Sequence, residues 1–193
     1  MKYLLLGNGK IKPSKRFDGF DAVVQFNHCR HRARVPAAAL RWVFLSNTGS
    51  PMERNVDILC GLAADPALRD AVIIEARSPR FYRFKRALLW LCRSPHWQHF
   101  TPSNAGRRLE RLWPVQTLDF AASWRLERKM CRAGMPGFMM PSTGMIAFDW
   151  VCQRMQPGDS LHIDGFGWRG WEGHPWEIEQ AMMRKVLGWR GVG

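Results

Sequence analysis

Acidic residues are scarce in this sequence. The 193 residues include 29 Lys and Arg but only 16 Asp and Glu, so the formal net charge is +13 and the pI is about 10.4. A chain this basic is expected to meet polyanions, such as nucleic acid, acidic lipid, or a phosphorylated glycan or nucleotide. The excess is concentrated between Arg77 and Arg132, where 13 Arg or Lys accompany three acidic residues. We therefore expect a basic segment over residues 77–140.

Cysteine pairs are also missing. The five cysteines are odd in number and widely spaced, and none forms a Cys-x-x-Cys motif. This pattern argues against a disulfide framework and against a zinc ribbon, and it indicates a reducing compartment. The histidines other than His174 show no ligand spacing with acidic or thiol partners, so no metal site is predicted.

Long apolar runs are absent as well. The first run covers only residues 3–6, and the others are equally short, so neither a signal peptide nor a membrane span is expected. The content of 46% hydrophobic and 12% aromatic residues is nonetheless typical of a folded protein. The length suits a single domain over 1–193, and we expect it to be cytoplasmic.

Short apolar runs bounded by Gly, Asn or Asp predict buried strands, and longer stretches between or after them predict helices. The expected strands are 3–6, 22–26, 42–45, 71–75 and 161–163. The expected helices are 56–64, 80–93, 104–112, 123–132, 143–155 and 175–187, while the run 113–141 is expected to be rich in loops. Strands interleaved with helices indicate an α/β protein, here a single Rossmann-like α/β/α sandwich with a mostly parallel sheet.

Ligands of such sheets bind beyond the carboxyl ends of the strands. Four segments are expected there: Gly7-Asn8-Gly9, Asn27-His28, Ser46-Asn47-Thr48-Gly49 and Gly165-Phe166-Gly167. Glycines let a ligand approach the backbone, and Asn side chains donate and accept hydrogen bonds. The alternative for Gly7-Asn8-Gly9 is a tight turn, because the third glycine of a dinucleotide fingerprint is missing.

A further anion site is predicted where Ser142, Thr143 and Gly144 begin a helix. Ser142 is a suitable cap, and the free backbone N–H groups and the helix dipole favour negative charge there. An ordinary capped helix is the alternative interpretation of this segment.

These segments together resemble the motifs of sialyltransferases. Gly7-Asn8-Gly9 with Phe20-Asp21-Ala22-Val23-Val24-Gln25-Phe26-Asn27 resembles the large sialyl motif. Pro141-Ser142-Thr143-Gly144-Met145, continuing to His162-Ile163-Asp164-Gly165-Phe166-Gly167, is similar to the small motif. His174 and Glu179 have the spacing of the very small motif. Tyr3 and Gly158 stand where animal members have bridged cysteines, and Gln25 replaces the usual Arg.

The resemblance implies a bacterial glycosyltransferase of lipopolysaccharide or capsule synthesis. It would move sialic acid or Kdo from its CMP ester to a glycan or glycolipid hydroxyl by an inverting displacement that needs no metal or other cofactor. His174 is then the general base, supported by Glu179. The donor-binding residues implied are Gly7, Asn8, Gly9, Asn27, Ser142, Thr143, Gly144 and Gly165, with Arg169 as an added cation.

The segment 80–93 combines two faces at helical spacing. Apolar residues recur at 81, 84, 88 and 91, and the neighbouring cations and aromatic residue are Arg80, Arg83, Arg86, Trp90 and Arg93. One interpretation is a helix at the inner face of the cell membrane, close to a lipid-linked acceptor. The alternative is a helix packed on the sheet with a solvated basic face.

Two other functional classes stay open. The first is a non-catalytic nucleotide-binding or accessory protein of the same fold. The second is a nucleic-acid-binding protein, which the charge favours but which no helix-turn-helix, zinc-finger or RNP-type motif supports.

Overall fold

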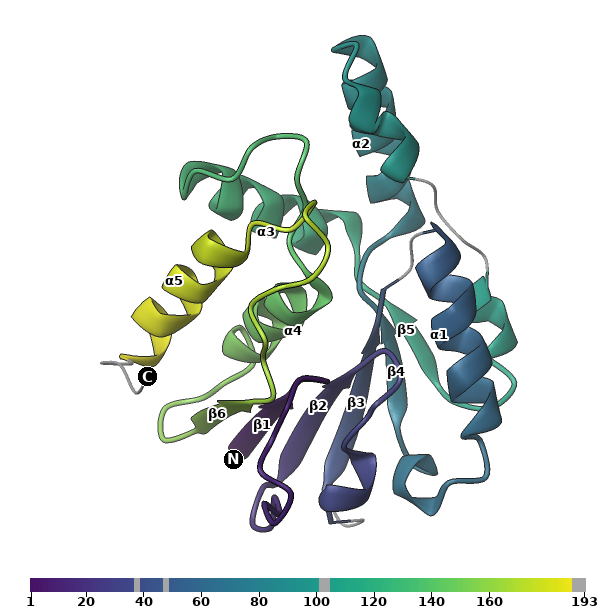
Figure 1. The fold of residues 1–193 in the computed structure, drawn as a ribbon, viewed down its shortest axis with the longest axis vertical. Coiled ribbons are helices and arrows are strands. Elements are labelled where there is room, and N and C mark those ends of the chain that lie inside the picture. The colour runs from purple at the N-terminus through teal and green to yellow at the C-terminus, as the bar shows by residue number, and fades with distance from the viewer. Residues whose placement is uncertain (37–38, 47–48, 101–104, 189–193) are drawn as a thin grey trace.

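Six parallel strands form one sheet at the centre of the computed structural model, which describes residues 1–36, 39–46, 49–100 and 105–188 (Figure 1). The strands are β1 (Lys2–Leu6), β2 (Ala22–Phe26), β3 (Leu40–Leu45), β4 (Val72–Glu75), β5 (Val115–Thr117) and β6 (Ser160–Asp164). Their order across the sheet is β5-β4-β3-β2-β1-β6, and all neighbours are parallel. The predicted Rossmann-like α/β arrangement with a parallel sheet is therefore confirmed.

Five helices in the described residues accompany the sheet: α1 (Gly49–Gly61), α2 (Pro79–Leu91), α3 (Phe120–Arg132), α4 (Thr143–Cys152) and α5 (Trp176–Leu187). Short 3-10 turns cover Arg32–Arg34, Pro66–Leu68, Pro95–His99 and Ala105–Arg108. Several helix starts follow from local chemistry. Ser78 and Asp119 accept hydrogen bonds from the first turns of α2 and α3, and Pro79 opens α2 where no N–H is needed.

Both faces of the sheet are buried along β1 to β4, which explains why these strand sequences do not alternate between apolar and polar residues. On one face, Tyr3 and Leu5 of β1 pack with apolar residues of α3, α4 and α5. On the other face, Leu4 and Leu6 pack against Phe17 of the long connection between β1 and β2. Farther along that second face, α1 covers β3 and β4. The sheet is thus a core layer between two covers.

The structure differs from the expected elements at three places, the first of which is α1: it covers Gly49–Gly61 and not the expected 56–64. β5 lies within the run 113–141 that we expected to be rich in loops, and its three residues, half-buried or exposed, give almost no hydrophobic signal. The expected helix 104–112 is only a 3-10 turn over Ala105–Arg108, and residue 104 lies outside the described residues. Asn47 and Thr48 of the third strand-end segment also lie outside them.

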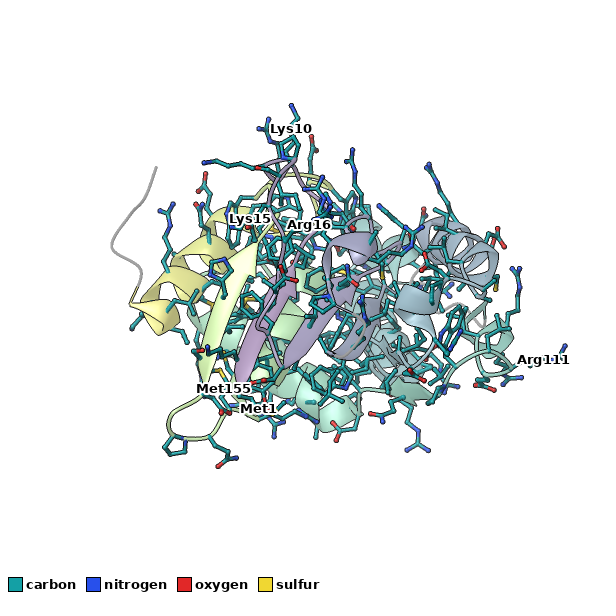
Figure 2. The ribbon with its side chains drawn as sticks, turned by 90° about the horizontal axis from the view of Figure 1, so that it is seen from below. Met1, Lys10, Lys15, Arg16, Arg111 and Met155 are labelled. Atoms are coloured by element: carbon teal, nitrogen blue, oxygen red, sulfur yellow. The ribbon has the colours of Figure 1, made fainter. Side chains whose placement is uncertain are left out.

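The order of strands reverses between β1 and β6. The chain builds β1 to β5 in one direction and then returns to place β6 on the other side of β1. In open parallel sheets, the carboxyl ends at such a reversal form the usual ligand-binding crevice. The side chains of Lys10, Lys15 and Arg16 gather on the connection that leaves β1 at this edge (Figure 2), and Lys15 pairs with Asp164 at the end of β6.

Candidate functional site

The glycine segments after β1 and β6 pack against each other. Gly7 N donates a hydrogen bond to Asp164 O at 2.8 Å, and Gly9 N donates to Gly165 O at 2.7 Å. A Cβ atom at Gly9 would lie 2.6 Å from the Gly165 oxygen, and one at Gly7 would overlap the same atom. The close approach that requires these glycines is therefore between two backbone segments of the protein itself.

A substitution tests this packing role. Gly9→Ala should lower the free energy of unfolding by about 1–3 kcal/mol, because neither backbone segment is a flexible side chain that can give way. Gly61→Ala is the matched control, since a Cβ at Gly61 would meet nothing within 4 Å. Equal urea midpoints for the two variants would contradict the packing role.

The two asparagines predicted to bind a ligand hold the ends of neighbouring strands together. Asn8 donates from Nδ2 to Phe26 O at 2.9 Å and accepts from Arg30 N at 2.9 Å. Asn27 has a left-handed backbone, with φ of 50°, and its Oδ1 accepts from Ser46 N at 3.0 Å. These bonds fix the carboxyl edge of β1, β2 and β3.

The N-terminus of α4 is bound by a buried carboxylate. Glu179 is 1% exposed, and its two oxygens accept hydrogen bonds from Ser142 N and Ser142 Oγ, both at 2.6 Å. Ser142 Oγ in turn accepts from Met145 N at 3.1 Å, as a helix cap does. Burial raises the pKa of Glu179 to about 7, against the lowering effect of the Ser142 bonds and of Arg77. The protein thus supplies its own acidic group at the predicted anion site.

Three consecutive carbonyls just before α4 each bond a basic side chain. Lys85 Nζ donates to Met139 O at 2.6 Å, His174 Nδ1 bonds Met140 O at 2.8 Å, and an Arg77 terminal nitrogen donates to Pro141 O. With Glu179 on Ser142, four titratable side chains from separate parts of the chain hold residues 139–142. We call Arg77, Lys85, His174 and Glu179 the charged clamp.

His174 is neutral in this arrangement. Its Nδ1 must carry the proton, because a carbonyl oxygen only accepts hydrogen bonds. Burial, with Arg77 as a further unfavourable charge, lowers the pKa of His174 to about 4, although the bond to Met140 opposes the change. The rings of Trp171 and Trp176 contact the imidazole edge-on, with centroids at 4.9 and 5.1 Å. The imidazole is enclosed by aromatic rings and serves to hold the backbone.

Lys85 also forms a buried ion pair with Glu127. The side chains are 4% and 7% exposed, and Glu127 Oε2 is a buried oxygen without a hydrogen-bond partner among the described residues. Burial lowers the pKa of Lys85, and the Glu127 carboxylate opposes this. The ion pair joins α2 to α3 behind the charged clamp.

The structure therefore sorts the predicted residues into groups. His174, Glu179 and Ser142 converge on residues 139–142, whereas Gly7, Asn8, Gly9, Asn27 and Gly165 line the ends of β1, β2 and β6. Thr143 and Gly144 are half-buried, and a Cβ at Gly144 would lie 2.8 Å from the Phe166 ring. Arg169 is exposed. His174 bonds Met140 O and Glu179 bonds Ser142 N, two residues apart, and both stabilise the start of α4.

Sequence reasoning missed Arg77, Lys85 and Glu127. A signal for Arg77 was available, because it follows the β4 sequence in the same way that Asn8 and Asn27 follow β1 and β2. Lys85 and Glu127 lie within basic, amphipathic helices. The sequence of such a helix does not show which one of its charged residues faces inward. Within the described ranges, no group of three or more His, Cys, Asp or Glu residues could hold a metal ion.

The helix α2 is both packed and exposed. Phe81, Tyr82, Lys85 and Leu89 are buried, whereas Phe84, Leu88, Trp90 and Leu91 are 42–69% exposed. Of the predicted surface residues, Arg80, Arg83 and Arg93 are exposed and Arg86 lies over the Trp97 ring at 4.9 Å. In the part of the chain that the structure describes, no helix combines the length and apolarity needed to cross a bilayer.

Comparisons with known proteins correct the predicted function. No protein-family model matches the chain, and no solved structure matches it. The chain is similar to a urease operon 23 kDa accessory protein of Rhizobium meliloti (strain 1021), with 26% identity over 196 residues that cover 92% of this chain and 84% of that protein.

This near full-length similarity overturns the identification as a sialyltransferase. The predicted activity, a CMP-sugar-dependent glycosyltransferase of lipopolysaccharide or capsule synthesis, is therefore wrong. The predicted partners, a CMP-sugar donor and a glycan or glycolipid acceptor, are wrong for the same reason. The prediction that the arginines of the segment 80–93 lie close to a lipid-linked acceptor is also wrong, because it depended on that activity. The motif matches have a physical explanation in packing, since the glycines let two loops approach closely and Glu179 bonds Ser142, the cap of α4. The similarity agrees with the alternative of an accessory protein.

Proposed function

We propose that this protein is a non-catalytic, nucleotide-binding accessory protein of a urease or of a comparable multi-component enzyme system. The accessory role is carried over from the similar protein of Rhizobium meliloti. The all-parallel sheet, with its reversal between β1 and β6, supports a nucleotide at the carboxyl edge. All five cysteines are free, which supports a reducing cytoplasm as its location.

The observation that carries the non-catalytic part is the charged clamp. A general base needs a free, basic atom in reach of a substrate proton. Glu179 instead has both oxygens bonded to Ser142. His174 donates Nδ1–H to Met140 O, and its pKa, lowered to about 4, makes the remaining ring nitrogen, Nε2, a weak base. These side chains support binding by fixing the backbone beside the edge.

Calorimetry with a panel of nucleotides tests this proposal. We expect saturable binding of at least one nucleoside phosphate below millimolar concentration, with the nucleotide recovered unchanged by chromatography. Asn27→Asp should weaken the binding about tenfold, because it adds a negative charge at the edge while keeping the oxygen that bonds Ser46. Asn tolerates the left-handed backbone, and so does Asp.

Gln156→Glu is the matched control for this variant. It adds the same charge in the exposed turn before β6, at the opposite edge of the sheet. No binding by the folded protein at millimolar nucleotide would contradict the nucleotide part of the proposal, and conversion of the nucleotide would contradict the non-catalytic part. Retention of urease subunits on the immobilised protein, absent with immobilised albumin, is the result expected for the accessory role.

A further inference from the structure

A basic pocket opens beside the carboxyl edge, between the loop after β2 and the helix α1. Its volume is about 850 Å³, and the lining includes His28, Arg30, Arg32, Arg54, Ile58 and Leu62. No carboxylate lines it among the described residues. Three arginines line this one concave surface, and an ion pair with Asp65 compensates part of the charge of Arg32. The remaining positive charge favours a polyanion in the pocket.

The loop that carries two of these arginines is fixed before any ligand arrives. Asn27 and Cys29 both have left-handed backbones, with φ of 50° and 47°, which costs free energy in residues other than glycine. The conformation persists because Asn27 bonds Ser46 N and because Arg30 N donates to Asn8 Oδ1 at 2.9 Å. Strain of this kind, held by surrounding bonds, clusters at ligand-binding positions.

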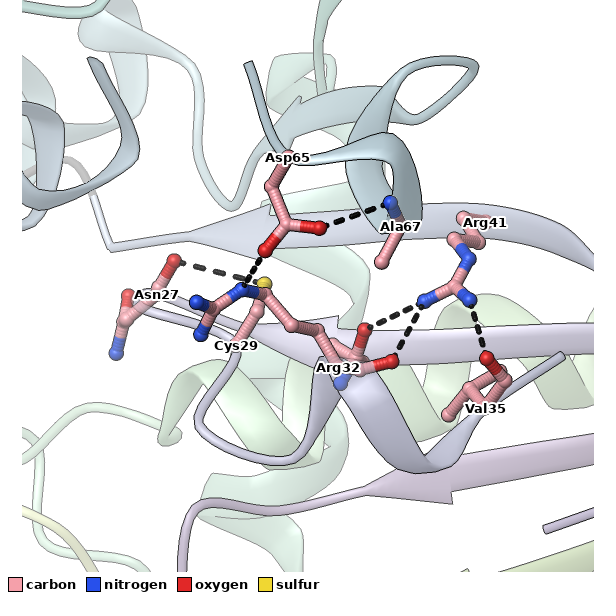
Figure 3. A network of polar contacts seen from close by, with 8 residues as sticks. Asn27, Cys29, Arg32, Val35, Arg41, Asp65 and Ala67 are labelled. Atoms are coloured by element: carbon pink, nitrogen blue, oxygen red, sulfur yellow. Dashed lines mark hydrogen bonds and ion pairs between the residues drawn. The ribbon is translucent and has the colours of Figure 1, made fainter. Parts of the chain in front are cut away.

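A buried network lies beneath the same loop (Figure 3). Arg41 is 6% exposed and donates to Val35 O at 2.7 Å and to Arg32 O at 3.4 Å. The Cys29 thiol is fully buried 3.8 Å from Asn27 O, and burial raises its pKa to about 12, so it stays neutral. The network fixes the backbone from which Arg30 and Arg32 project.

Arg32 is oriented by a single acidic contact. Its Nε donates to Asp65 Oδ2 at 2.5 Å, while Figure 3 shows its two terminal nitrogens pointing away from Asp65, toward the Asn27 end of the loop. Asp65 is itself held by Ala67 N at 2.9 Å. A guanidinium held at Nε presents its terminal N–H groups in the fork geometry that suits phosphate oxygens.

The helix α1 supplies the opposite wall. Arg54 and Ile58 are one turn apart on one face, and Leu62 follows just beyond the helix end. Arg54 is exposed in the second turn of α1. Ile58 and Leu62 add apolar surface to a lining that is otherwise polar and cationic.

We propose that this pocket binds the phosphate chain of a phosphorylated small molecule, with Arg30, Arg32 and Arg54 on the phosphates and Ile58 and Leu62 against the remainder of the ligand. The inference rests on the proposed function only in taking a nucleoside as that remainder. It places the phosphate subsite at the end of β2, away from the α4 N-terminus that Glu179 already binds.

Titration calorimetry with inorganic tripolyphosphate and with ATP tests the pocket. The double variant Arg30→Ala/Arg54→Ala should weaken both ligands at least tenfold, and the parent protein should bind both less tightly as salt is raised. Both side chains are exposed, so the variant is expected to keep the parent's melting temperature. Arg69→Ala/Arg111→Ala is the matched control, because it removes two exposed arginines that do not line the pocket.

The outcomes separate the pocket from the proposed function. Loss of both ligands in the pocket variant but not in the control supports the pocket. If the pocket variant loses tripolyphosphate binding, and the parent binds ATP no more tightly than tripolyphosphate, the pocket is still supported. The nucleoside would then be removed from the proposed function. Unchanged ATP binding in the pocket variant, equal losses in the control, or no binding of either ligand to the parent would each overturn the inference.

Discussion

Lys85→Met is expected to lower the free energy of unfolding by about 3–5 kcal/mol, which is a large part of the stability of a small domain. The substitution leaves the Glu127 carboxylate buried without its cation and removes the donor to Met139 O. Glu127 Oε2 already has no hydrogen-bond partner in the described part of the chain, so the remaining charge is poorly compensated. Urea unfolding followed by circular dichroism measures the effect.

Two further variants separate the effect of the unpaired buried charge from the effect of removing any lysine that forms an ion pair. Lys85→Met/Glu127→Leu should recover most of the loss, because an apolar pair of similar volume avoids the desolvation penalty. Lys129→Met should cost less than about 1 kcal/mol, because Lys129 is half exposed in its pair with Asp149. A double variant as unstable as Lys85→Met alone would show that the loss comes from packing and not from the unpaired charge.

Glu179→Gln and His174→Gln are expected to change the pH dependence of stability in opposite directions. The folded state raises the pKa of Glu179 from 4.5 to about 7, so the stability that Glu179 confers is present below pH 4.5 and is lost as pH rises through 7. The folded state lowers the pKa of His174 from 6.5 to about 4, so its contribution is present above pH 6.5 and is lost as pH falls toward 4.

The two contributions oppose each other between about pH 4.5 and 6.5, where the parent protein should show a nearly flat contribution from this pair. Each amounts to roughly 3 kcal/mol over its full range. Relative to the parent, Glu179→Gln should gain stability as pH rises from 4.5 to 7, and His174→Gln should lose stability as pH rises from 4 to 6.5. Subtracting the parent's curve from each variant's curve cancels the other titrating groups.

Urea midpoints measured at half-unit pH intervals give these curves. Glu177→Gln is a suitable reference variant, because Glu177 is an exposed carboxylate two residues earlier on the same helix. Difference curves with the same sign for Glu179→Gln and His174→Gln would contradict the opposed burial of the two groups. A flat curve for Glu179→Gln would show that its carboxylate is not desolvated at the start of α4.

The sequence predicted the fold better than the function because the two depend on different signals. Burial of both faces of the sheet makes β1 to β4 read as nearly continuous apolar runs, and these were predicted close to their observed places. The edge strand β6 was also predicted near its place, from the alternating apolar residues Leu161 and Ile163. β5 is a short edge strand with little burial, so its pairing with β4 could not be read from its residues.

The motif interpretation failed because one residue pattern serves more than one physical purpose. Gly7 and Gly9 are required by the backbone of the β6 loop, and Glu179 is required by the orphan N–H groups of α4. Each of these structural roles selects the same residue types as a ligand-binding site does. The residues alone were compatible with a glycosyltransferase and with an accessory protein, and the near full-length similarity to an accessory protein distinguished between them.

The scarcity of acidic residues and the short apolar runs by themselves determined that this is a basic, folded α/β protein with polar segments at its strand ends. The tertiary structure decided how those charges are used. It buries Lys85, Arg77 and Arg41 as supports for backbone carbonyls, and it gathers Arg30, Arg32 and Arg54 around one pocket. The physical reason is that a net charge is a sum over residues, whereas the energy of each charge depends on burial and on neighbours that are distant in sequence.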